Sequence, residues 1–338
     1  MVSPLPLPRA SGAPFAACRV NILLVSTTAI GDTVMATPFL RAVRRRYPEA
    51  RITMFAHVRR IEIFKNNPHA DRLLPYYGKG KKLLRTLTAL RGGRFGLVII
   101  LHANDPDIVP LARWTRAPMR VGWGESRRAG WLTHTILRTN PPEHFMLHKK
   151  RLLESVDIPV EDLRTEIFLD AADEAPYRRD LLPWLKGASP AGGYVAMHAF
   201  GSHSAKWWPL ENFFEMARRI RERQGLAAVF VGDTEAALLA RRHPRFDPAI
   251  HFAPGGCSIR ESAVFIREAR GMLTTDSGPM HLAFALRCPS LCLFGPTKPE
   301  LHGPCFDTER HLVLARDPLA SLTVEEVADA WGRLAARL

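Results

Sequence analysis

The sequence predicts an α/β protein made of two doubly wound, Rossmann-like domains that face one another across a central cleft. Three observations support this fold class. Short apolar runs alternate with helical patterns in two separate series, as in parallel sheets covered by helices. The length of 338 residues suits two domains. Polar turns follow several predicted strands, at the edge where such sheets bind their ligands.

The first series occupies residues 19–160. It opens with Val20-Asn21-Ile22-Leu23-Leu24-Val25-Ser26, a nearly continuous apolar run that is typical of a buried parallel strand. Further strands are predicted at residues 51–56, 72–76, 95–101 and 120–123. Helices are predicted at residues 38–47, 58–66, 81–91, 108–115 and 144–156. Thr37 is the expected N-cap of the first helix, and Pro38 is its expected first residue.

The second series occupies residues 191–338. Strands are predicted at residues 194–198, 227–231, 251–252, 271–275 and 290–294, with helices between them. Ser258 with Glu261, and Thr323 with Glu326, have capping-box spacing and mark two helix starts. We leave open whether the last helix packs back on the N-terminal domain. Residues 161–190, which are acidic and poorly periodic with several prolines, are the predicted linker.

Residues 1–18 are predicted to form a disordered tail. They are rich in Pro and Ala and lack the basic start and apolar core of a signal peptide. No apolar run approaches the ~18–20 residues of a membrane span. The five cysteines are odd in number and scattered, which fits reduced thiols in a cytoplasmic protein. Their spacing favours burial in the core over a zinc site.

The net charge of +14 is unevenly distributed. Residues 1–160 carry 26 Lys and Arg against 10 Asp and Glu, a balance of +16. Residues 161–338 carry 21 against 23, a balance of −2. A basic half indicates a polyanionic partner, which could be nucleic acid, an anionic membrane surface or a phosphorylated substrate. The alternative is a charged surface that only keeps the protein soluble.

Two strand-to-helix turns carry candidate site residues. In the C-terminal half, Asp276 ends an apolar run and Ser277, Gly278 and Pro279 lead into a helix. The free N–H groups of that helix start can bind an anion, and Asp276 is placed to point into the crevice. The simpler alternative is an N-cap without a ligand. Asp32 has the same kind of place in the N-terminal half, where its alternative role is to stabilise the turn.

A further turn supplies groups that suit a nucleotide diphosphate. Lys206 offers a positive charge and Ser202 a hydroxyl, while Glu235 could bind ribose hydroxyls. A carboxylate at Asp32, opposite a diphosphate site, could remove a proton from an acceptor hydroxyl that attacks a sugar carbon. Lys206 and the helix starts would stabilise the leaving diphosphate without a metal.

Several familiar motifs are missing. The sequence has no GxGxxG after its first strand, no GxxxxGK[ST] and no GxSxG, which disfavours dinucleotide oxidoreductases and P-loop kinases. The histidines share no metal-ligand spacing and are expected to be structural or on the surface; they are His57, His102, His144, His148 and His198.

Four motifs in order, between residue 20 and about residue 304, resemble glycosyltransferase family 9, the bacterial ADP-heptose:lipopolysaccharide heptosyltransferases. They are Gly31-Asp32-Thr33-Val34-Met35-Ala36-Thr37-Pro38, Lys206-Trp207-Trp208-Pro209, Thr275-Asp276-Ser277-Gly278-Pro279-Met280-His281-Leu282-Ala283 and Leu293-Phe294-Gly295-Pro296-Thr297. Arg120-Val121-Gly122 and the helix around His148 are also similar to the family. The segment Ser26-Thr27-Thr28-Ala29 lacks the basic residue that many members carry there.

The resemblance implies a GT-B fold and an inverting, metal-independent glycosyltransferase without a cofactor. The N-terminal domain would bind the acceptor and the C-terminal domain the nucleotide sugar, ADP-heptose. Asp32 would be the catalytic base, and Lys206 would hold the phosphates and sugar of the donor. The other donor contacts that it implies are Ser202 and the amides of Ser277 and Gly278 for phosphate, Asp276 for sugar hydroxyls, Glu235 for ribose and His281 in the donor site.

The implied acceptor is an acidic lipopolysaccharide inner-core glycolipid, which accounts for the basic half. The implied location is cytoplasmic, with peripheral contact at the anionic inner face of the inner membrane and no nucleic-acid partner. Candidate acceptor contacts, weighed against a solvated charged face, are Arg59, Arg60, Arg120, Arg127 and Arg128. Three alternatives stay open: a family 9-type transferase with another nucleotide sugar or acceptor, a nucleotide-sugar epimerase, and a non-catalytic binding module. Intact Asp32, Lys206 and Asp276 argue against the last.

Overall fold

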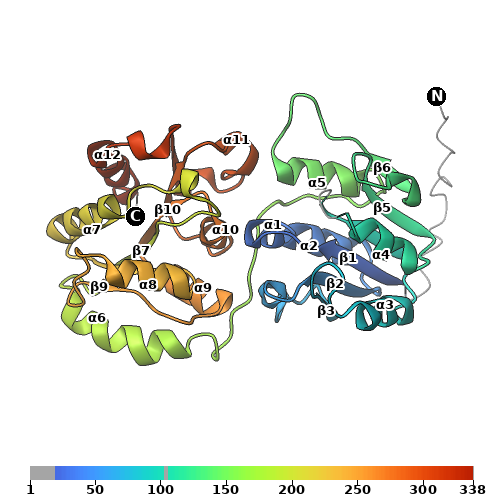
Figure 1. Ribbon diagram of the computed structural model, residues 1–338, viewed down its shortest axis with the longest axis horizontal. Helices are drawn as coiled ribbons and strands as arrows, with labels where there is room; N and C mark the ends of the chain where they lie inside the picture. The colour runs from blue at the N-terminus through green and yellow to red at the C-terminus, as the bar shows by residue number, and fades with distance from the viewer. Residues whose placement is uncertain (1–19, 103–105, 338) are drawn as a thin grey trace.

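The computed structural model describes residues 20–102 and 106–337, so the predicted N-terminal tail lies outside the described residues. Two α/β domains lie side by side, each a parallel six-stranded sheet with helices on both faces (Figure 1). The predicted pair of doubly wound domains is therefore confirmed.

The N-terminal domain has the strand order β3-β2-β1-β4-β5-β6. Leu24 of β1 lies opposite Met54 of β2 and Ile99 of β4, so the first apolar run is the centre of the sheet. The elements are β1 (Asn21–Ser26), α1 (Ile30–Val34), α2 (Thr37–Arg46), β2 (Arg51–His57), the 3₁₀ helix η1 (Ile61–Phe64), β3 (Arg72–Tyr76), α3 (Leu83–Gly92), β4 (Leu97–Ile100), α4 (Ile108–Trp114), β5 (Met119–Trp123), the 3₁₀ helix η2 (Ala129–Trp131), β6 (His134–Ile136) and α5 (Phe145–Glu154).

The C-terminal domain repeats this topology with the strand order β12-β11-β10-β7-β8-β9. Its elements are η3 (Tyr177–Leu181), α6 (Leu182–Ala188), β7 (Tyr194–His198), η4 (Ser204–Lys206), α7 (Leu210–Gln224), β8 (Ala227–Phe230), α8 (Thr234–Arg242), β9 (His251–Phe252), α9 (Ile259–Arg267), β10 (Gly271–Thr275), α10 (Gly278–Ala285), β11 (Ser290–Phe294), α11 (Pro299–His302), η5 (Thr308–Arg310), β12 (His311–Ala315), η6 (Leu319–Ser321) and α12 (Val324–Ala335).

In each sheet the strand order reverses between the first and fourth strands. The pairs are β1 with β4 and β7 with β10. A crevice opens outside the carboxyl ends of the strands at such a switch point, because neighbouring connections leave in opposite directions. Asp32 follows β1, Lys206 follows β7 and Asp276 follows β10, so the three side chains come from these two switch points.

Apolar cores cover both faces of each sheet. In the N-terminal domain α2 and α5 pack on one face, and α3 and α4 on the other. In the C-terminal domain one core contains α7, α8 and α12, and the other contains α6, α9 and α10. Val34 of α1 and Ile63 of η1 are fully buried in the second of these cores, so apolar packing continues from one domain to the other.

The structure answers the open question about the last helix and differs from the sequence prediction in three details. The last helix, α12, buries Trp331 and Leu334 in the C-terminal core and packs on α7, β11 and β12, so it does not pack back on the N-terminal domain. The predicted linker contains η3 and α6, since Leu181 and Leu185 find an apolar partner in the C-terminal core. Strands β6 and β12 lie in segments for which no strand was predicted.

The third difference concerns the turn after β1, which is largely the short helix α1. As a result Thr37 is the first residue of α2 and not its N-cap. The Thr37 hydroxyl donates to the carbonyl oxygen of Val34 and accepts from the N–H of Glu166. Thr37 therefore joins α1, α2 and the linker, and α1 holds Asp32 on a helix rather than on a free loop.

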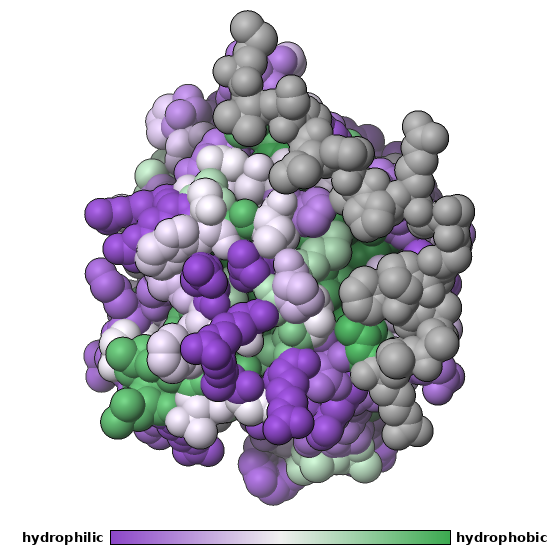
Figure 2. All heavy atoms as spheres, turned by 90° about the vertical axis from the view of Figure 1, so that its right-hand side faces the viewer, coloured by the Kyte–Doolittle hydropathy of each residue, from purple (hydrophilic) through white to green (hydrophobic). Residues whose placement is uncertain are grey.

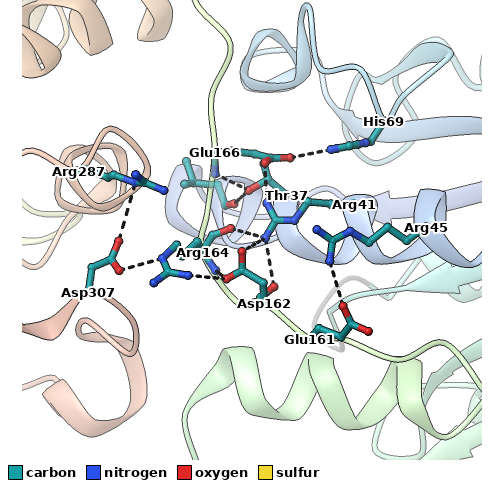
Figure 3. A network of polar contacts seen from close by, with 11 residues as sticks. Thr37, Arg41, Arg45, His69, Glu161, Asp162, Arg164, Glu166, Arg287 and Asp307 are labelled. Atoms are coloured by element: carbon teal, nitrogen blue, oxygen red, sulfur yellow. Dashed lines mark hydrogen bonds and ion pairs between the residues drawn. The ribbon is translucent and has the colours of Figure 1, made fainter.

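The linker is fixed to both domains by charged groups (Figure 3). Arg41 of α2 pairs with Glu166 at 2.5 Å and donates to the carbonyl oxygens of Asp162 and Arg164. Arg164 pairs with Asp307 of the C-terminal domain at 2.9 Å. Hydrogen bonds to charged groups are stronger than neutral ones, so this network stabilises one path of the linker.

A buried arginine joins the domains on the other side of the linker. Arg260 of α9 is only 2% exposed and makes two hydrogen bonds to the carboxylate of Asp173. It also donates to the carbonyl oxygens of Glu62 and Lys65 in the N-terminal domain. A buried guanidinium requires such partners, so Arg260 stabilises the contact between the two domains.

No helix in the described part of the chain combines the length and apolar character needed to cross a membrane.

Candidate active site

Two glycines allow the domains to touch at the site. A Cβ on Gly31 of α1 would lie 2.4 Å from the ring of His281, and a Cβ on Gly278 of α10 would lie 2.8 Å from Ile30. Both distances are too short for real contacts. The helices α1 and α10 thus bring Asp32 and the α10 start together across the cleft.

A cavity of about 490 Å³ lies between the domains. It is large enough for a small ligand. The N-terminal domain contributes α1 and Arg60 to its wall, and the C-terminal domain contributes the turns after β7, β8 and β10. Most of the predicted donor residues line it, namely Ser202, Lys206, Asp276, Ser277, Gly278 and His281, together with Asp32.

Lys206 is held at the cavity wall by Asp276. Their Nζ and Oδ2 atoms are 2.5 Å apart, and the Thr297 hydroxyl donates to the same carboxylate at 2.6 Å. Burial by itself raises the pKa of Asp276, but the hydrogen bonds from Lys206 and Thr297 outweigh it and hold the pKa below its usual range. Asp276 is therefore charged, and in this structure it orients Lys206.

The start of α10 faces the same cavity. Ser277 occupies the N-cap position, but its hydroxyl donates backwards to the carbonyl oxygen of Thr275 and does not cap the helix. Pro279 stands in the first turn, as the sequence predicts. The positive end of the helix dipole therefore points to a cavity wall that also carries Lys206, which suits an anionic ligand.

Asp32 stands opposite, on the N-terminal side. Its carboxylate oxygen Oδ1 is 3.3 Å from Nζ of Lys149, a lysine of α5 whose side chain is 5% exposed. Burial alone would raise the pKa of Asp32, but Lys149, Thr28 and His102 together outweigh it, so the pKa lies below its usual range. A carboxylate of this kind is ionised at neutral pH and can accept a proton.

A second, smaller cavity of about 160 Å³ opens on the other side of Asp32. Its wall belongs mainly to the N-terminal domain and mixes basic with aromatic side chains. Arg138 lies over the rings of Trp123 and Phe145, at 5.8 Å from each centroid. The lining residues are Thr28, Asp32, Leu101, His102, Trp123, Arg138, Phe145, His148, Lys149 and His302. Asp32 and His302 line both cavities.

The buried histidines at the domain contact are neutral at physiological pH. Burial holds the pKa of His281 well below its usual range, although Asp276 and Asp32 act in the opposite direction. Burial lowers the pKa of His144 to about 4, and its Nε2 atom hydrogen-bonds the carbonyl oxygen of Gly303 across the domain contact. These groups shape the site without adding positive charge to it.

Some predicted site residues lie elsewhere. Glu235 is exposed on α8 and does not line the large cavity; Asp233, which caps that helix, does. Of the five candidate acceptor arginines, only Arg60 lines a cavity. Arg120 donates to the carbonyl oxygens of Ala117 and Trp131 and so supports its own loop.

The remaining three arginines lie on the surface. Arg59, Arg127 and Arg128 are exposed. Arg128 lies 5.3 Å from the ring centroid of Trp131, outside both cavities.

Sequence reasoning did not identify Lys149, Arg138 or His302. For Lys149 a signal was present, because it lies three residues from both Met146 and Leu152, on the buried face of α5. A lysine on the apolar face of a helix indicates a buried charged partner. Arg138 and His302 come from irregular or very short segments, where no periodicity indicates the direction of a side chain.

No group of three His, Cys, Asp or Glu side chains within residues 20–102 and 106–337 could hold a metal ion. Metal independence stays a prediction.

Comparisons with known proteins agree on one family. The sequence model of glycosyltransferase family 9 (heptosyltransferase) matches residues 84–331. Lipopolysaccharide heptosyltransferase 2 of Salmonella typhimurium is 22% identical over 306 residues, which cover 84% of this chain and 85% of that protein. Lipopolysaccharide heptosyltransferase 3 of Escherichia coli K12 is 25% identical over 284 residues, with coverages of 79% and 80%.

Solved structures have the same fold. A family 9 glycosyltransferase from Veillonella parvula superposes with a TM-score of 0.80 at 20% identity, covering 94% of this chain and 98% of that one. The E. coli ADP-heptose lps heptosyltransferase II has a TM-score of 0.76 at 19% identity, with coverages of 94% and 99%. The two Rossmann-like domains facing a cleft thus form a GT-B fold, and the protein is a glycosyltransferase. The chain belongs to glycosyltransferase family 9.

Proposed function

We propose that the protein transfers a heptose from ADP-heptose to an acidic inner-core acceptor of lipopolysaccharide, with inversion and without a metal. The observation that carries this proposal is the position of Asp32. It lies where the large cavity and the small cavity meet, and it is the charged residue with a place in both linings. A base at that junction can take the proton of an acceptor hydroxyl in the small cavity. The oxygen of that hydroxyl can then attack a sugar carbon in the large cavity.

The large cavity is the proposed donor site. Lys206 and the start of α10 provide the positive groups that a diphosphate needs. Ser202 lies in the turn between β7 and Lys206 and supplies a hydroxyl and backbone N–H groups. Asp233, in the turn after β8, replaces Glu235 as the candidate partner of the ribose hydroxyls, because only Asp233 lines the cavity. The choice of ADP-heptose as the donor rests on the similarity to the E. coli ADP-heptose lps heptosyltransferase II.

The small cavity is the proposed acceptor site. Sugar rings pack on aromatic side chains, which Trp123 and Phe145 supply, and acidic groups on the acceptor would pair with Arg138 and Lys149. These residues replace Arg59, Arg120, Arg127 and Arg128 as candidates for direct contact. Arg60 lines the large cavity and not the small one, so it is a candidate donor contact rather than an acceptor contact.

The proposed reaction is a single displacement. The acceptor oxygen attacks the anomeric carbon, the bond from that carbon to the diphosphate oxygen breaks, and the hydroxyl proton passes to the Asp32 carboxylate. The attack comes from the side opposite the leaving group, so the configuration at that carbon inverts. ADP leaves with the negative charge of the broken bond, which Lys206 and the α10 N–H groups stabilise.

The donor assignment is tested by calorimetry with ADP-heptose, UDP-sugars and GDP-sugars in EDTA. We expect binding of ADP-heptose and none of comparable affinity for the others. A preference for UDP or GDP would reject ADP-heptose as the donor while leaving the displacement mechanism intact. Dependence on a divalent cation would reject the metal-free account.

Lys149→Met should move the acid limb of the transfer rate to higher pH. Lys149 lowers the pKa of Asp32, so removal of its charge raises that pKa, and the basic form of Asp32 is then lost at a higher pH than in the wild type. The pH profile of kcat measures the shift. Lys150→Met is the matched control, because Lys150 is the next residue of α5 and pairs with Glu154 instead. An unmoved acid limb would mean that Lys149 does not tune the base.

A further inference from the structure

His302, at the end of α11, brings the C-terminal domain into the wall of the small cavity. Of the described residues that line this cavity, it is the only one from the C-terminal domain. It also lines the large cavity, and the residue that shares both linings with it is Asp32. The proposed transfer therefore takes place between a carboxylate of one domain and an imidazole of the other.

Contacts with the N-terminal domain fix the position of His302. Its ring packs on Phe145 of α5, with 4.6 Å between the ring centroids. The carbonyl oxygen of the next residue, Gly303, accepts a hydrogen bond from Nε2 of His144 at 3.0 Å. Nδ1 of His144 accepts from the N–H of Met146, so the proton of this imidazole is on Nε2. His302 is therefore held in place before a substrate binds, as a binding residue should be.

The segment that carries His302 also reaches the donor site. Thr297, in the turn that leads into α11, donates its hydroxyl to the carboxylate of Asp276. The same carboxylate holds Lys206. The charge of Asp276 influences the pKa of His302 more strongly than the charge of Asp32 does, and electrostatic effects weaken with distance. His302 thus lies towards the donor side of the junction, where the transferred sugar would be.

The imidazole of His302 is neutral, and its two nitrogens are available to a ligand. Burial holds its pKa below the usual range. Within residues 20–102 and 106–337, neither ring nitrogen of His302 forms a hydrogen bond with the protein. A neutral imidazole offers one donor and one acceptor. It therefore matches a hydroxyl group, which also donates and accepts, better than it matches a phosphate, which only accepts.

The positive side chains of the protein attract anionic substrates but do not distinguish one sugar from another. Hydrophilic side chains also gather on the end of the N-terminal domain that Figure 2 shows, which is turned away from the C-terminal domain (Figure 1). Such side chains can steer an anionic substrate without contact with the reacting atoms. Selection between sugars requires a group that contacts their hydroxyls. Of the two residues at the junction, Asp32 is charged and His302 is neutral.

We propose that His302 binds a hydroxyl group of the transferred sugar and so helps to determine which sugar the enzyme accepts. This inference rests on the proposed function and deepens it, because it names the part of the donor that His302 recognises. A site that hydrogen-bonds a substrate hydroxyl disfavours the analogue that lacks it, since the polar group of the site is then left without a partner.

The test combines loss of the imidazole with loss of single hydroxyls from the donor. Transfer by the wild type and by His302→Phe is measured with ADP-heptose and with analogues that each lack one hydroxyl of the heptose. Phenylalanine keeps a ring that can pack on Phe145 but has no ring nitrogen. For one analogue we expect kcat/KM of the wild type to fall about fivefold or more. His302→Phe should show a similar loss with ADP-heptose and no further loss with that analogue.

Two further variants support the interpretation. His302→Gln, whose amide can donate and accept, should keep most of the discrimination between ADP-heptose and that analogue. His243→Phe is the matched control, because His243 also stacks on a phenylalanine, Phe214 at 4.7 Å, and lines neither cavity. It should discriminate as the wild type does. The ratio of the rates for two donors within one variant does not depend on the fraction of folded protein.

Losses that add for every analogue would overturn the proposal and leave the proposed function in place. Non-additive losses that appear only with deoxygenated acceptors would overturn the assignment to the transferred sugar. A wild type without any turnover of ADP-heptose would overturn the proposed function and this inference with it, so the two failures can be told apart.

Discussion

Asp32→Asn should lower the rate of sugar transfer at least about 10²-fold and leave donor affinity nearly unchanged. An amide cannot take the proton of the acceptor hydroxyl, but it keeps the size of the carboxylate. Donor contacts come mainly from the C-terminal domain, whereas Asp32 lies at the junction of the two cavities. Turnover from transfer assays and affinity from calorimetry with the donor separate the two effects.

The Asn substitution also leaves Lys149 without its 3.3 Å partner. The double variant Asp32→Asn with Lys149→Met removes this complication, and it should be as inactive as the single variant. Asp71→Asn is the control, because Asp71 pairs with Arg44 on the surface and lines neither cavity. Near-normal turnover of Asp32→Asn would contradict the assignment of Asp32 as the catalytic base.

Lys206→Ala should weaken donor binding at least about tenfold and reduce turnover by about 10²–10³-fold. The lysine is the cation beside the α10 start, and its charge would stabilise the diphosphate more as the bond breaks than before. Its loss also leaves Asp276 buried without its ion pair at 2.5 Å, a negative charge that would repel the donor.

Lys206→Ala with Asp276→Asn separates these two contributions. If the repulsion matters, the double variant should bind donor better than Lys206→Ala alone and still turn over slowly. Lys186→Ala, on an exposed lysine of the same domain, should have no effect. Unaltered affinity of Lys206→Ala for ADP would remove this residue from the donor site.

The two-domain α/β architecture could be predicted from the sequence because local patterns decide it, whereas the short strands β6 and β12 and the helices of the linker could not. The apolar run at residues 20–26 indicates a buried strand and forms β1, and the boxes at Ser258 and Thr323 do cap α9 and α12. The turns with Asp32, Lys206 and Asp276 each follow a predicted strand. In the structure these strands are the ones at the switch points of the two sheets. These three residues met in one cavity as predicted from their places in the chain.

What the sequence did not reveal depends on tertiary contacts. Lys149 reaches Asp32 across 117 residues, and Gly278 is small because Ile30 of the other domain lies against it. Glu235 and Asp233 are two residues apart, and only the direction of α8 decides which of them lines the cavity. Only the positive charge of the candidate acceptor arginines points to an acidic acceptor, and charge does not distinguish a pocket from an exposed face.

The most direct test of heptose transfer is a reaction of the protein with ADP-heptose and a series of truncated lipopolysaccharide inner-core acceptors, in EDTA. The anomeric configuration of the product is read by NMR. We expect one added heptose with inverted configuration, formed only when an acceptor is present. Retained configuration would contradict the single displacement. Conversion of free donor without acceptor would indicate an epimerase. Transfer only from UDP- or GDP-sugars would show that the protein does not transfer heptose from ADP-heptose.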